Sequence, residues 1–247
     1  MSDSTTAATP EQASEQVSAT EVAEDVRRRL VLALDVDDLV AARRLARELR
    51  PFFGTMKVGL ELYSAAGPEA ISLLTALDVD VFCDLKLHDI PQTVGRAARV
   101  LGALGARYVN LHTAGGVSML RAGVEGLREG AAEAGLPDPV ALGVTVLTSE
   151  PEASTHLLHQ RVAAGLDGGC DGFVCAVPDV EAIRQLAPAA VLATPGIRPE
   201  GAAIDDQRRV ATPRQALDAG ADLLIVGRPV THADDPAAAA RALVAGL

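Results

Sequence analysis

The sequence predicts a single (β/α)8 TIM barrel of the α/β class, preceded by a disordered N-terminal tail. Two observations lead to this prediction. From residue 30 onward, eight short segments rich in Val, Leu and Ile alternate with longer segments of helical composition, which is the rhythm of strand–helix units around a parallel sheet. Eight such units in about 215 residues fit a compact barrel. An open doubly wound sheet is the alternative, but LALDVDD stands where its glycine-rich dinucleotide-binding sequence would follow the first strand.

Each predicted strand is a run of aliphatic residues bounded by Gly, Pro, Asp or another turn-forming residue. In chain order the strands begin near Leu30 (LVLALD), Thr55 (TMKVGLE), Val79 (VDVFCDLK), Ala106 (ARYVNLH), Val140 (VALGVTVL), Asp171 (DGFVCA), Ala190 (VLATPG) and Asp222 (DLLIVG). The helices predicted between them are recognised by composition, and several open with Asp or Pro at a usual starting position. They include Asp38–Arg50, Pro68–Leu77, Pro91–Gly102, Val117–Ala134 and Thr212–Ala219.

Composition and charge divide the chain into two regions. With 49% hydrophobic and 22% charged residues, its 247 residues suffice for one large core. We assign residues 29–247 to the barrel and 1–28 to an acidic low-complexity tail, because residues 1–25 hold six acidic side chains, no basic ones and few large apolar ones. Residues 26–247 carry 22 basic and 27 acidic side chains without a basic stripe, so no nucleic-acid partner is expected.

Membrane, secreted and metal-binding classes are also disfavoured. No segment reaches the roughly 18 uncharged apolar residues of a membrane helix, so no membrane partner is expected. The N-terminus lacks the basic and apolar regions of a secretory signal, which favours a cytoplasmic location. The three cysteines, Cys83, Cys170 and Cys175, are an odd number, and a disulfide framework is not expected. The histidines show no zinc-ligand spacing, so no metal is assigned.

Polar residues gather at the carboxyl ends of the predicted strands, where barrel enzymes place their chemistry. Asp84 and Lys86 are two residues apart, so on a strand both side chains point to the same face. Taken alone, such a pair is explained by a simple ion pair. Five charged groups would, however, alternate in sign around one pocket: Asp35, Lys57, Asp84, Lys86 and Asp89. Burying so many charges is costly and is usually tolerated for function, which indicates a catalytic site.

Several ordered motifs carry a resemblance to a known family. The motifs are LALD at 32–35, KVGLELY at 57–63, DLKLHDIPQTV at 84–94, VLTS at 146–149, TPGIRPEG at 194–201, DDQRR at 205–209 and VGRPVT at 226–231. Together they resemble the orotidine 5'-phosphate decarboxylases from residue 30 to about residue 240. The resemblance implies conversion of orotidine 5'-monophosphate to uridine 5'-monophosphate in de novo pyrimidine biosynthesis, without a cofactor.

The same resemblance implies roles for individual residues. Lys86 is the implied donor that protonates C6 after loss of carbon dioxide, and Asp84 faces the carboxylate that leaves. Lys57 and Asp89 complete the implied catalytic set, while Asp89 and Thr93 reach into the neighbouring site of a homodimer. The implied substrate-binding residues are Asp35, Lys57, Ile90, Thr93, Thr148, Pro195, Arg198, Gln207, Gly227 and Arg228.

Residue chemistry supports the implied reaction independently. Decarboxylation without an electron-sink cofactor leaves a carbanion that must be stabilised and protonated where it forms, and a fixed ammonium does both. Gly227 allows close backbone approach of a phosphate, and Arg228 offers a forked donor at a common phosphate position of barrels. The loop from Pro195 to about Arg209 holds two glycines and two prolines, and we expect a mobile lid there.

Two rival functions stay open at this point. A magnesium-dependent sugar-phosphate decarboxylase of the same barrel group shares the D-x-K-x-x-D pattern, and sensitivity to a chelator would separate it. A non-catalytic regulator that binds nucleotide phosphates is the rival from another class, but the intact Asp84, Lys86 and Asp89 argue against it.

The sequence departs from the family pattern at Gln92, where Asn is usual. The longer side chain would move the amide by more than one ångström, so the local contact of this amide is expected to differ.

Overall fold

The eight predicted strands form a closed parallel barrel in the computed structural model, which describes residues 22–147, 154–198 and 211–247. Neighbouring strands follow the order of the chain, and pairing of the first strand with the last closes the barrel. The strands are β1 (Leu30–Leu34), β2 (Thr55–Gly59), β3 (Asp80–Leu87), β4 (Tyr108–His112), β5 (Val140–Val144), β6 (Gly172–Val174), β7 (Val191–Thr194) and β8 (Leu223–Val226). The prediction of a (β/α)8 barrel is therefore confirmed.

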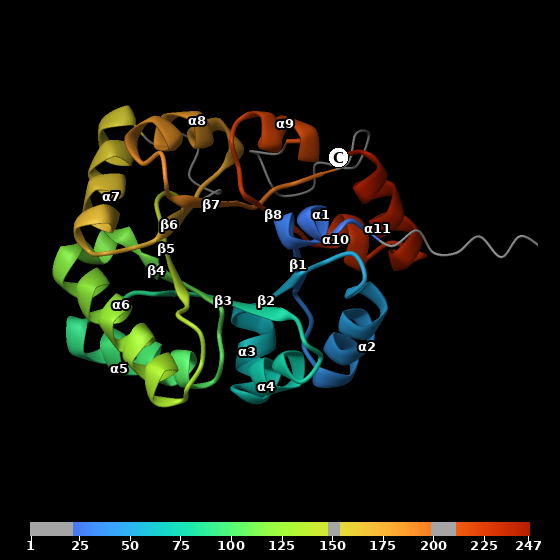
Figure 1. The fold of residues 1–247 in the computed structure, drawn as a ribbon, viewed down its shortest axis with the longest axis horizontal. Coiled ribbons are helices and arrows are strands. Elements are labelled where there is room, and N and C mark those ends of the chain that lie inside the picture. Colours follow the sequence, from blue (N-terminus) through green and yellow to red (C-terminus); the bar gives the residue numbers. More distant parts are fainter. Residues whose placement is uncertain (1–21, 148–153, 199–210) are drawn as a thin grey trace, which may run out of the picture.

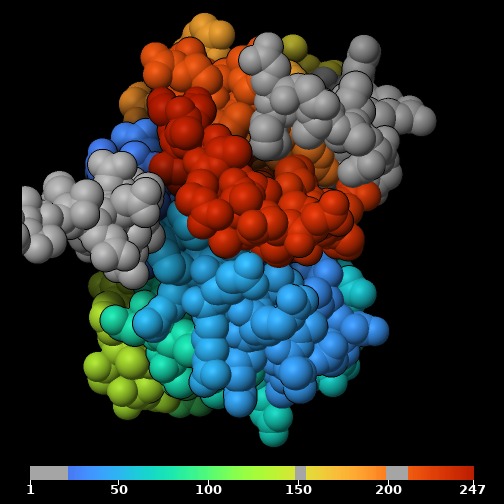
Figure 2. Space-filling model, turned by 90° about the vertical axis from the view of Figure 1, so that its right-hand side faces the viewer, coloured from blue at the N-terminus to red at the C-terminus, as the bar shows by residue number. Residues whose placement is uncertain are grey.

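Helices surround the ring of strands (Figure 1). They are α1 (Glu24–Arg29), α2 (Leu39–Leu49), α3 (Leu60–Ala66), α4 (Glu69–Thr75), α5 (Pro91–Ala103), α6 (Gly116–Glu133), α7 (Thr155–Asp167), α8 (Val177–Leu186), α9 (Pro213–Asp218), α10 (Arg228–Thr231) and α11 (Pro236–Ala245), with a short 3-10 helix at Thr113–Gly115. Figure 2 shows the last helices, in red, directly beside α2, in blue, so the two ends of the barrel also meet on its outer surface. None of the helices in the described ranges is long and apolar enough to cross a membrane.

Local chemistry explains where several helices start. The side chain of Asp38 accepts hydrogen bonds from the backbone N–H groups of Val40 and Ala41 at the start of α2. At α9, Thr212 precedes the proline at the first helical position and forms a reciprocal capping box with Gln215, the third helical residue. These contacts satisfy N–H groups that have no partner inside the helix, which fixes the points where the chain turns from loop to helix.

Several predicted boundaries differ from the structure, most clearly at the first helix and at the end of the fifth strand. Helix α1 lies across the predicted border between tail and barrel at residue 28, because Glu24 pairs with Arg27 and Arg28 and so stabilises one helical turn. The fifth strand, expected to run on to residue 147, ends at Val144, where its pairing with β6 also ends. The expectation of disorder for residues 1–21 lies outside the described residues.

The barrel has two apolar cores because successive side chains of each strand point alternately inward and outward. The outward side chains pack against the helices in a large buried cluster that includes Leu32, Val58 and Val109. The inward side chains form a smaller cluster inside the ring that includes Phe82 and Ile225. This alternation decides which residue at each strand end faces the inside of the barrel.

Glycines let α5 and α6 approach each other very closely. A Cβ atom at Gly130 would overlap the carbonyl oxygen of Arg99, and one at Gly126 would overlap the carbonyl oxygen of Gly95. Because these obstacles are backbone atoms, neither can be relieved by moving a side chain. The two helices that follow β3 and β4 are thereby locked together beside the most polar part of the barrel rim.

Candidate active site

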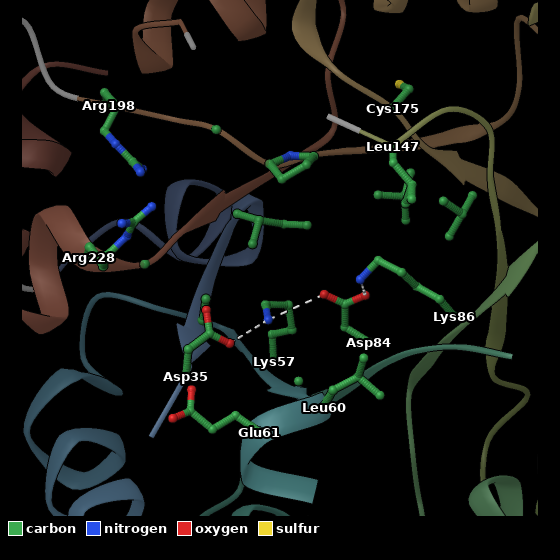
Figure 3. A pocket seen from close by; sticks show the side chains of 18 of the residues that line it. Asp35, Lys57, Leu60, Glu61, Asp84, Lys86, Leu147, Cys175, Arg198 and Arg228 are labelled. Carbon is green, nitrogen blue, oxygen red and sulfur yellow. Dashed lines mark hydrogen bonds and ion pairs between the residues drawn. The ribbon is translucent and has the colours of Figure 1, made fainter. Parts of the chain in front are cut away.

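A cavity of about 640 Å³ opens at the carboxyl ends of the strands. Strand ends or following loops of most of the barrel contribute to its wall, and Figure 3 shows the charged groups gathered on its floor. The lining residues are Ala33, Asp35, Lys57, Gly59, Leu60, Glu61, Asp84, Lys86, Val144, Val146, Leu147, Val174, Cys175, Pro195, Gly196, Arg198, Ile225, Gly227, Arg228 and His232. The cavity therefore lies at the end of the barrel where the sequence placed the chemistry.

Four charged side chains form a continuous chain of alternating sign on the cavity floor. The Nζ atom of Lys57 donates to Asp35 Oδ1 at 2.9 Å and lies 3.3 Å from Asp84 Oδ2. The other oxygen of Asp84 accepts from Lys86 Nζ at 2.5 Å. The set holds two carboxylates and two ammonium groups, so it is close to neutral before a substrate enters. Figure 3 shows the contacts of Lys57 and Lys86 as dashed lines on opposite sides of Asp84.

Strand alternation brings the first three of these groups to the inside of the barrel. Ala33 and Phe82 belong to the inner core, and Asp35 and Asp84 follow each of them by two residues. Lys57 is paired in register with both Ala33 and Phe82 on the neighbouring strands. Its ammonium group therefore lies between the two carboxylates.

Glycine at position 59 leaves the space in which these groups meet. A Cβ atom there would lie 2.9 Å from Asp35 Oδ1 and 3.0 Å from Lys57 Nζ, which is closer than ordinary contact. Helix α3 begins at the next residue, so the chain changes from strand to helix at Gly59, beside the ion pair. The glycine thus combines the turn with room for the charged chain.

The side chain of Lys86 lies in the cavity as predicted, but its backbone conformation differs from the predicted one. Regular alternation was expected to bring Asp84 and Lys86 to one face, but the pairing of β3 with β4 shifts register between Cys83 and Leu87. Lys86 has a φ of 50°, a left-handed conformation that is uncommon for lysine. The prediction that both side chains share one face holds, whereas the regular-strand geometry given as its reason is wrong.

The electrostatic balance keeps Lys57 and Asp84 charged. Burial acts to lower the pKa of Lys57, but the charges of Asp84 and Asp35 outweigh burial and raise the pKa above its ordinary value. Burial likewise acts to raise the pKa of Asp84, but Lys57 and Lys86 together with hydrogen bonds lower it. With the Lys57 side chain only 8% exposed, the two carboxylates are what make its buried charge tolerable.

The remaining walls of the cavity differ in character. One wall is apolar and is built by inward side chains of β5, β6 and β8, among them Val144, Val174 and Ile225. Another carries guanidinium groups: Arg198 is buried after β7 and Arg228 lies at the start of α10, far across the pocket from Lys86 in Figure 3. The backbone N–H of Arg198 donates to the carbonyl of Ala211, and this ties the two described ends of the intervening segment together.

The other predicted site residues fall into two groups. Asp89, Ile90 and Thr93 are exposed beyond the end of β3 and do not line this cavity. Thr148 and Gln207 lie outside the described residues, as does most of the predicted lid, of which only residues 195–198 are described.

Besides apolar lining residues, sequence reasoning missed three polar or charged side chains of this region. Glu61 and His232 line the cavity. Glu61 follows the end of β2 closely enough that the rule used for the other residues could have found it, whereas His232 lies beyond α10. Asn110 is fully buried in β4 and contacts both Asp84 and Lys86. The available signal was a polar residue in the middle of the apolar segment ARYVNLH.

No group of three or more His, Cys, Asp or Glu side chains within the described ranges is arranged to hold a metal ion. Two histidines at the ends of β3 and β4, His88 and His112, stack on each other with ring centroids 5.4 Å apart. His112 Nδ1 accepts a hydrogen bond from the backbone N–H of Ala114, which agrees with the structural rather than catalytic role expected for it.

The chain is similar over most of its length to proteins of one family. The model described as "Orotidine 5'-phosphate decarboxylase / HUMPS family" matches residues 28–243. The orotidine 5'-phosphate decarboxylase of Nitratidesulfovibrio vulgaris (strain DP4) is 50% identical over 228 residues, which cover 88% of this chain and 97% of the relative. That of Moorella thermoacetica is 44% identical over 232 residues, covering 89% and 92%. The crystal structure of orotidine 5'-phosphate decarboxylase from Lactobacillus acidophilus has a TM-score of 0.72 at 32% identity and covers 87% of this chain and 97% of its own.

Proposed function

Because the chain belongs to the orotidine 5'-phosphate decarboxylase / HUMPS family, we propose that it converts orotidine 5'-monophosphate to uridine 5'-monophosphate without a cofactor and with Lys86 as the proton donor. The observation that carries this proposal is the alternating chain of Asp35, Lys57, Asp84 and Lys86 on the floor of a cavity of about 640 Å³. Decarboxylation of this nucleotide is the step that completes uridine 5'-monophosphate in pyrimidine biosynthesis, and we propose that it takes place in the cytoplasm.

The first chemical step separates carbon dioxide from C6 of the pyrimidine. A substrate carboxylate beside Asp84 adds a negative charge to a set of groups that is balanced without it. At 4 Å two such charges repel by about 4 kcal/mol for an effective dielectric of 20. The bond between C6 and the carboxylate breaks, its electron pair stays on C6, and the carboxylate leaves as neutral carbon dioxide. The repulsion is relieved as the charge moves from the carboxylate to C6.

The second step is proton transfer from Lys86 to C6. The ammonium group attracts the negative charge that develops on C6, and this charge appears only as the bond breaks, so the attraction lowers the barrier rather than merely strengthening substrate binding. A proton then moves from Nζ to the electron pair on C6, and the lysine regains a proton from solvent. Lys86 suits this role better than Lys57, because its side chain is 33% exposed toward the cavity whereas that of Lys57 is 8% exposed and held between two carboxylates.

The remaining walls suit the other parts of the nucleotide. We assign the ribose to Asp35 and Lys57, and the phosphate to Arg228 and the backbone at Gly227, with Arg198 and Gln207 from the seventh loop. We assign the pyrimidine to the apolar wall and to Pro195, and we propose Thr148, which lies outside the described residues, as a further contact. The guanidinium groups support this orientation, because they lie across the pocket from Lys86 and so place an anion far from the reacting carbon.

A homodimer would complete the site with Asp89, Ile90 and Thr93 of a second chain. The supporting observation is that these residues follow the catalytic strand yet point to the surface, where Ile90 is 63% exposed. The test mixes Lys86→Ala and Asp89→Ala subunits, each inactive alone. If Asp89 acts across the interface, mixed dimers contain one intact site and recover about a quarter of wild-type activity at random pairing. No recovery in verified mixed dimers would place Asp89 in the site of its own chain.

The reaction itself is tested by following the ultraviolet absorbance of orotidine 5'-monophosphate with purified protein in excess EDTA. Loss of the orotate band at undiminished rate in the chelator supports cofactor-free decarboxylation. No reaction in EDTA, with turnover of a sugar-phosphate substrate restored by Mg²⁺, would instead assign the protein to a metal-dependent branch of the same barrel group.

A further inference from the structure

The side chain of Asn110 joins the backbone of one central residue of the site to the carboxylate of another. We propose that Asn110 is a positioning residue for the decarboxylation, which sets the conformation of Lys86 and the orientation of Asp84. The inference rests on the function proposed above and adds to it a residue of β4 that lies outside the motifs that carry the charged chain.

The irregular pairing of β3 with β4 creates the need for such a residue. Cys83 pairs with Val109 and Leu87 pairs with Leu111, so the three residues from 84 to 86 lie opposite Asn110 alone. A bulge of this kind leaves backbone groups without ladder partners inside the barrel, where an unsatisfied N–H is costly. The side chain of Asn110 supplies the missing acceptor, because its Oδ1 receives the backbone N–H of Lys86 at 2.7 Å.

This hydrogen bond selects the conformation that aims Lys86 into the cavity. A left-handed backbone is unfavourable for a residue with a Cβ atom, so the surroundings of Lys86 must favour it over the ordinary alternatives. In the structure the N–H of Lys86 donates to Asn110 Oδ1 while the residue holds a φ of 50°. Without this acceptor the residue is free to return toward a regular strand, which would change the direction of its ammonium group.

The amide nitrogen of Asn110 acts on the second catalytic residue. Nδ2 donates to Asp84 Oδ1 at 2.7 Å, and the same oxygen accepts from Lys86 Nζ at 2.5 Å. Asp84 Oδ2 is left to face Lys57 at 3.3 Å, so each ammonium group has its own carboxylate oxygen. Only one orientation of the amide is compatible with both contacts, because a flipped amide would set donor against donor and oxygen against oxygen. Asn110 has no exposed surface, so neither contact can be replaced by bulk water.

The first test measures kcat and KM for Asn110→Ala with orotidine 5'-monophosphate. We expect kcat to fall by roughly 10- to 100-fold, the range for losing a hydrogen bond to a charged group. We expect KM to change by less than about threefold, because the phosphate-binding guanidinium groups lie across the pocket from this amide. The matched control is Thr113→Val, which removes a buried hydrogen bond to the carbonyl of Val144 without touching the charged chain and should keep the wild-type kcat.

The second test separates positioning from a purely structural role through the pH dependence of Asn110→Asp. An aspartate can still accept the N–H of Lys86, but it donates to Asp84 only when protonated. The charged groups beside this position are Asp84, which the amide contacts directly, and the ammonium of Lys86, which contacts the same carboxylate oxygen. Burial and the directly contacting carboxylate raise the pKa of such a group. The ratio of variant to wild-type kcat should therefore increase as the pH is lowered from about 8 to about 6. A structural role predicts a ratio that does not change with pH.

The outcomes keep this inference and the proposed function apart. If the wild-type protein decarboxylates the nucleotide and both Asn110 variants keep its kcat, the inference is overturned while the proposed function stands. An equal loss in Asn110→Ala and Thr113→Val also overturns it, since a lost buried hydrogen bond would then suffice as explanation. If Asn110→Ala does not fold, the pH dependence of Asn110→Asp decides alone. A folded wild-type protein that does not act on the nucleotide overturns the proposed function and this inference together.

Discussion

Replacing Gly59 by alanine tests whether the position of Lys57 matters beyond its charge. The new methyl group would lie 2.9 Å from Asp35 Oδ1 and 3.0 Å from Lys57 Nζ, while ordinary contact begins near 3.4 Å. Both groups must therefore retreat by about half an ångström. The backbone itself accepts alanine, because the φ of Gly59 is −86°. The perturbation thus changes the geometry of the ion pair and leaves every charged group in place.

The expected magnitudes follow from this geometry. Overpacking of a buried position costs about 1–3 kcal/mol, and the lower entropy of alanine in the unfolded chain offsets about 0.4–1 kcal/mol of it. We expect a net loss of about 1–2 kcal/mol in the free energy of unfolding. A displacement of about half an ångström in a catalytic constellation lowers kcat/KM by roughly tenfold. The effect on activity should therefore exceed what the loss of stability explains.

The assay compares kcat/KM and urea unfolding of Gly59→Ala with those of the wild-type protein and of Gly246→Ala. In the control the added methyl group meets nothing closer than 3.5 Å, so both quantities should stay at wild-type values. Wild-type kcat/KM in a folded Gly59→Ala protein would refute the claim that Lys57 and Asp35 act in a narrowly defined position.

Three further perturbations have effects that the structure defines. Gly130→Ala forces a methyl group onto the carbonyl oxygen of Arg99 and should lower the free energy of unfolding in urea by at least about 2 kcal/mol, so a wild-type value would contradict the close packing of α5 and α6. Since the pKa of Asp84 is lowered in the folded state, its ionised form stabilises the fold above the ordinary carboxylate pKa near 4, and this contribution is lost as the pH falls through the lowered pKa. Stability measured between about pH 6 and pH 3 should thus fall more steeply for the wild-type protein than for Asp84→Asn, and equal slopes would contradict this. Burial raises the pKa of Cys83 and of Cys170 to about 12, so neither thiol should react with iodoacetamide in the folded protein at neutral pH. Mass spectrometry should find the label on both thiols only in denaturant, and labelling of the native protein would contradict their burial.

The fold could be predicted because every strand carries its own signal. Most are short segments dominated by aliphatic residues, such as LVLAL in β1 or LLIV in β8, and a strand buried on both faces needs such a segment. Helix α1 could not be separated from the acidic tail in the same way. Its six residues EDVRRR have no apolar face to detect, and the helix is anchored where its Arg27 carbonyl accepts the N–H of Gly54, a contact between distant parts of the chain.

The charged chain could be predicted as a group because strand ends converge in a barrel. Asp35, Lys57 and Asp84 occupy inward positions that follow from alternation alone. The conformation of Lys86 could not be predicted, since nothing in DLKLHD favours a left-handed lysine. That conformation depends on Asn110, which lies 24 residues further along the chain. The polar residue inside ARYVNLH is visible in the sequence, but local patterns do not carry contacts of this range, so its link between Asp84 and Lys86 emerges only from the three-dimensional structure.

The central claim is that Lys86 delivers the proton to C6 after carbon dioxide has left. The most direct measurement is the rate of loss of the orotate absorbance with Lys86→Ala in excess EDTA, beside the wild-type protein and after verifying that both bind uridine 5'-monophosphate. We predict rapid turnover by the wild-type protein and a loss of at least about a thousandfold in the variant, the scale of general acid catalysis combined with charge stabilisation. Near wild-type turnover by a Lys86→Ala protein that still binds the nucleotide would contradict the mechanism.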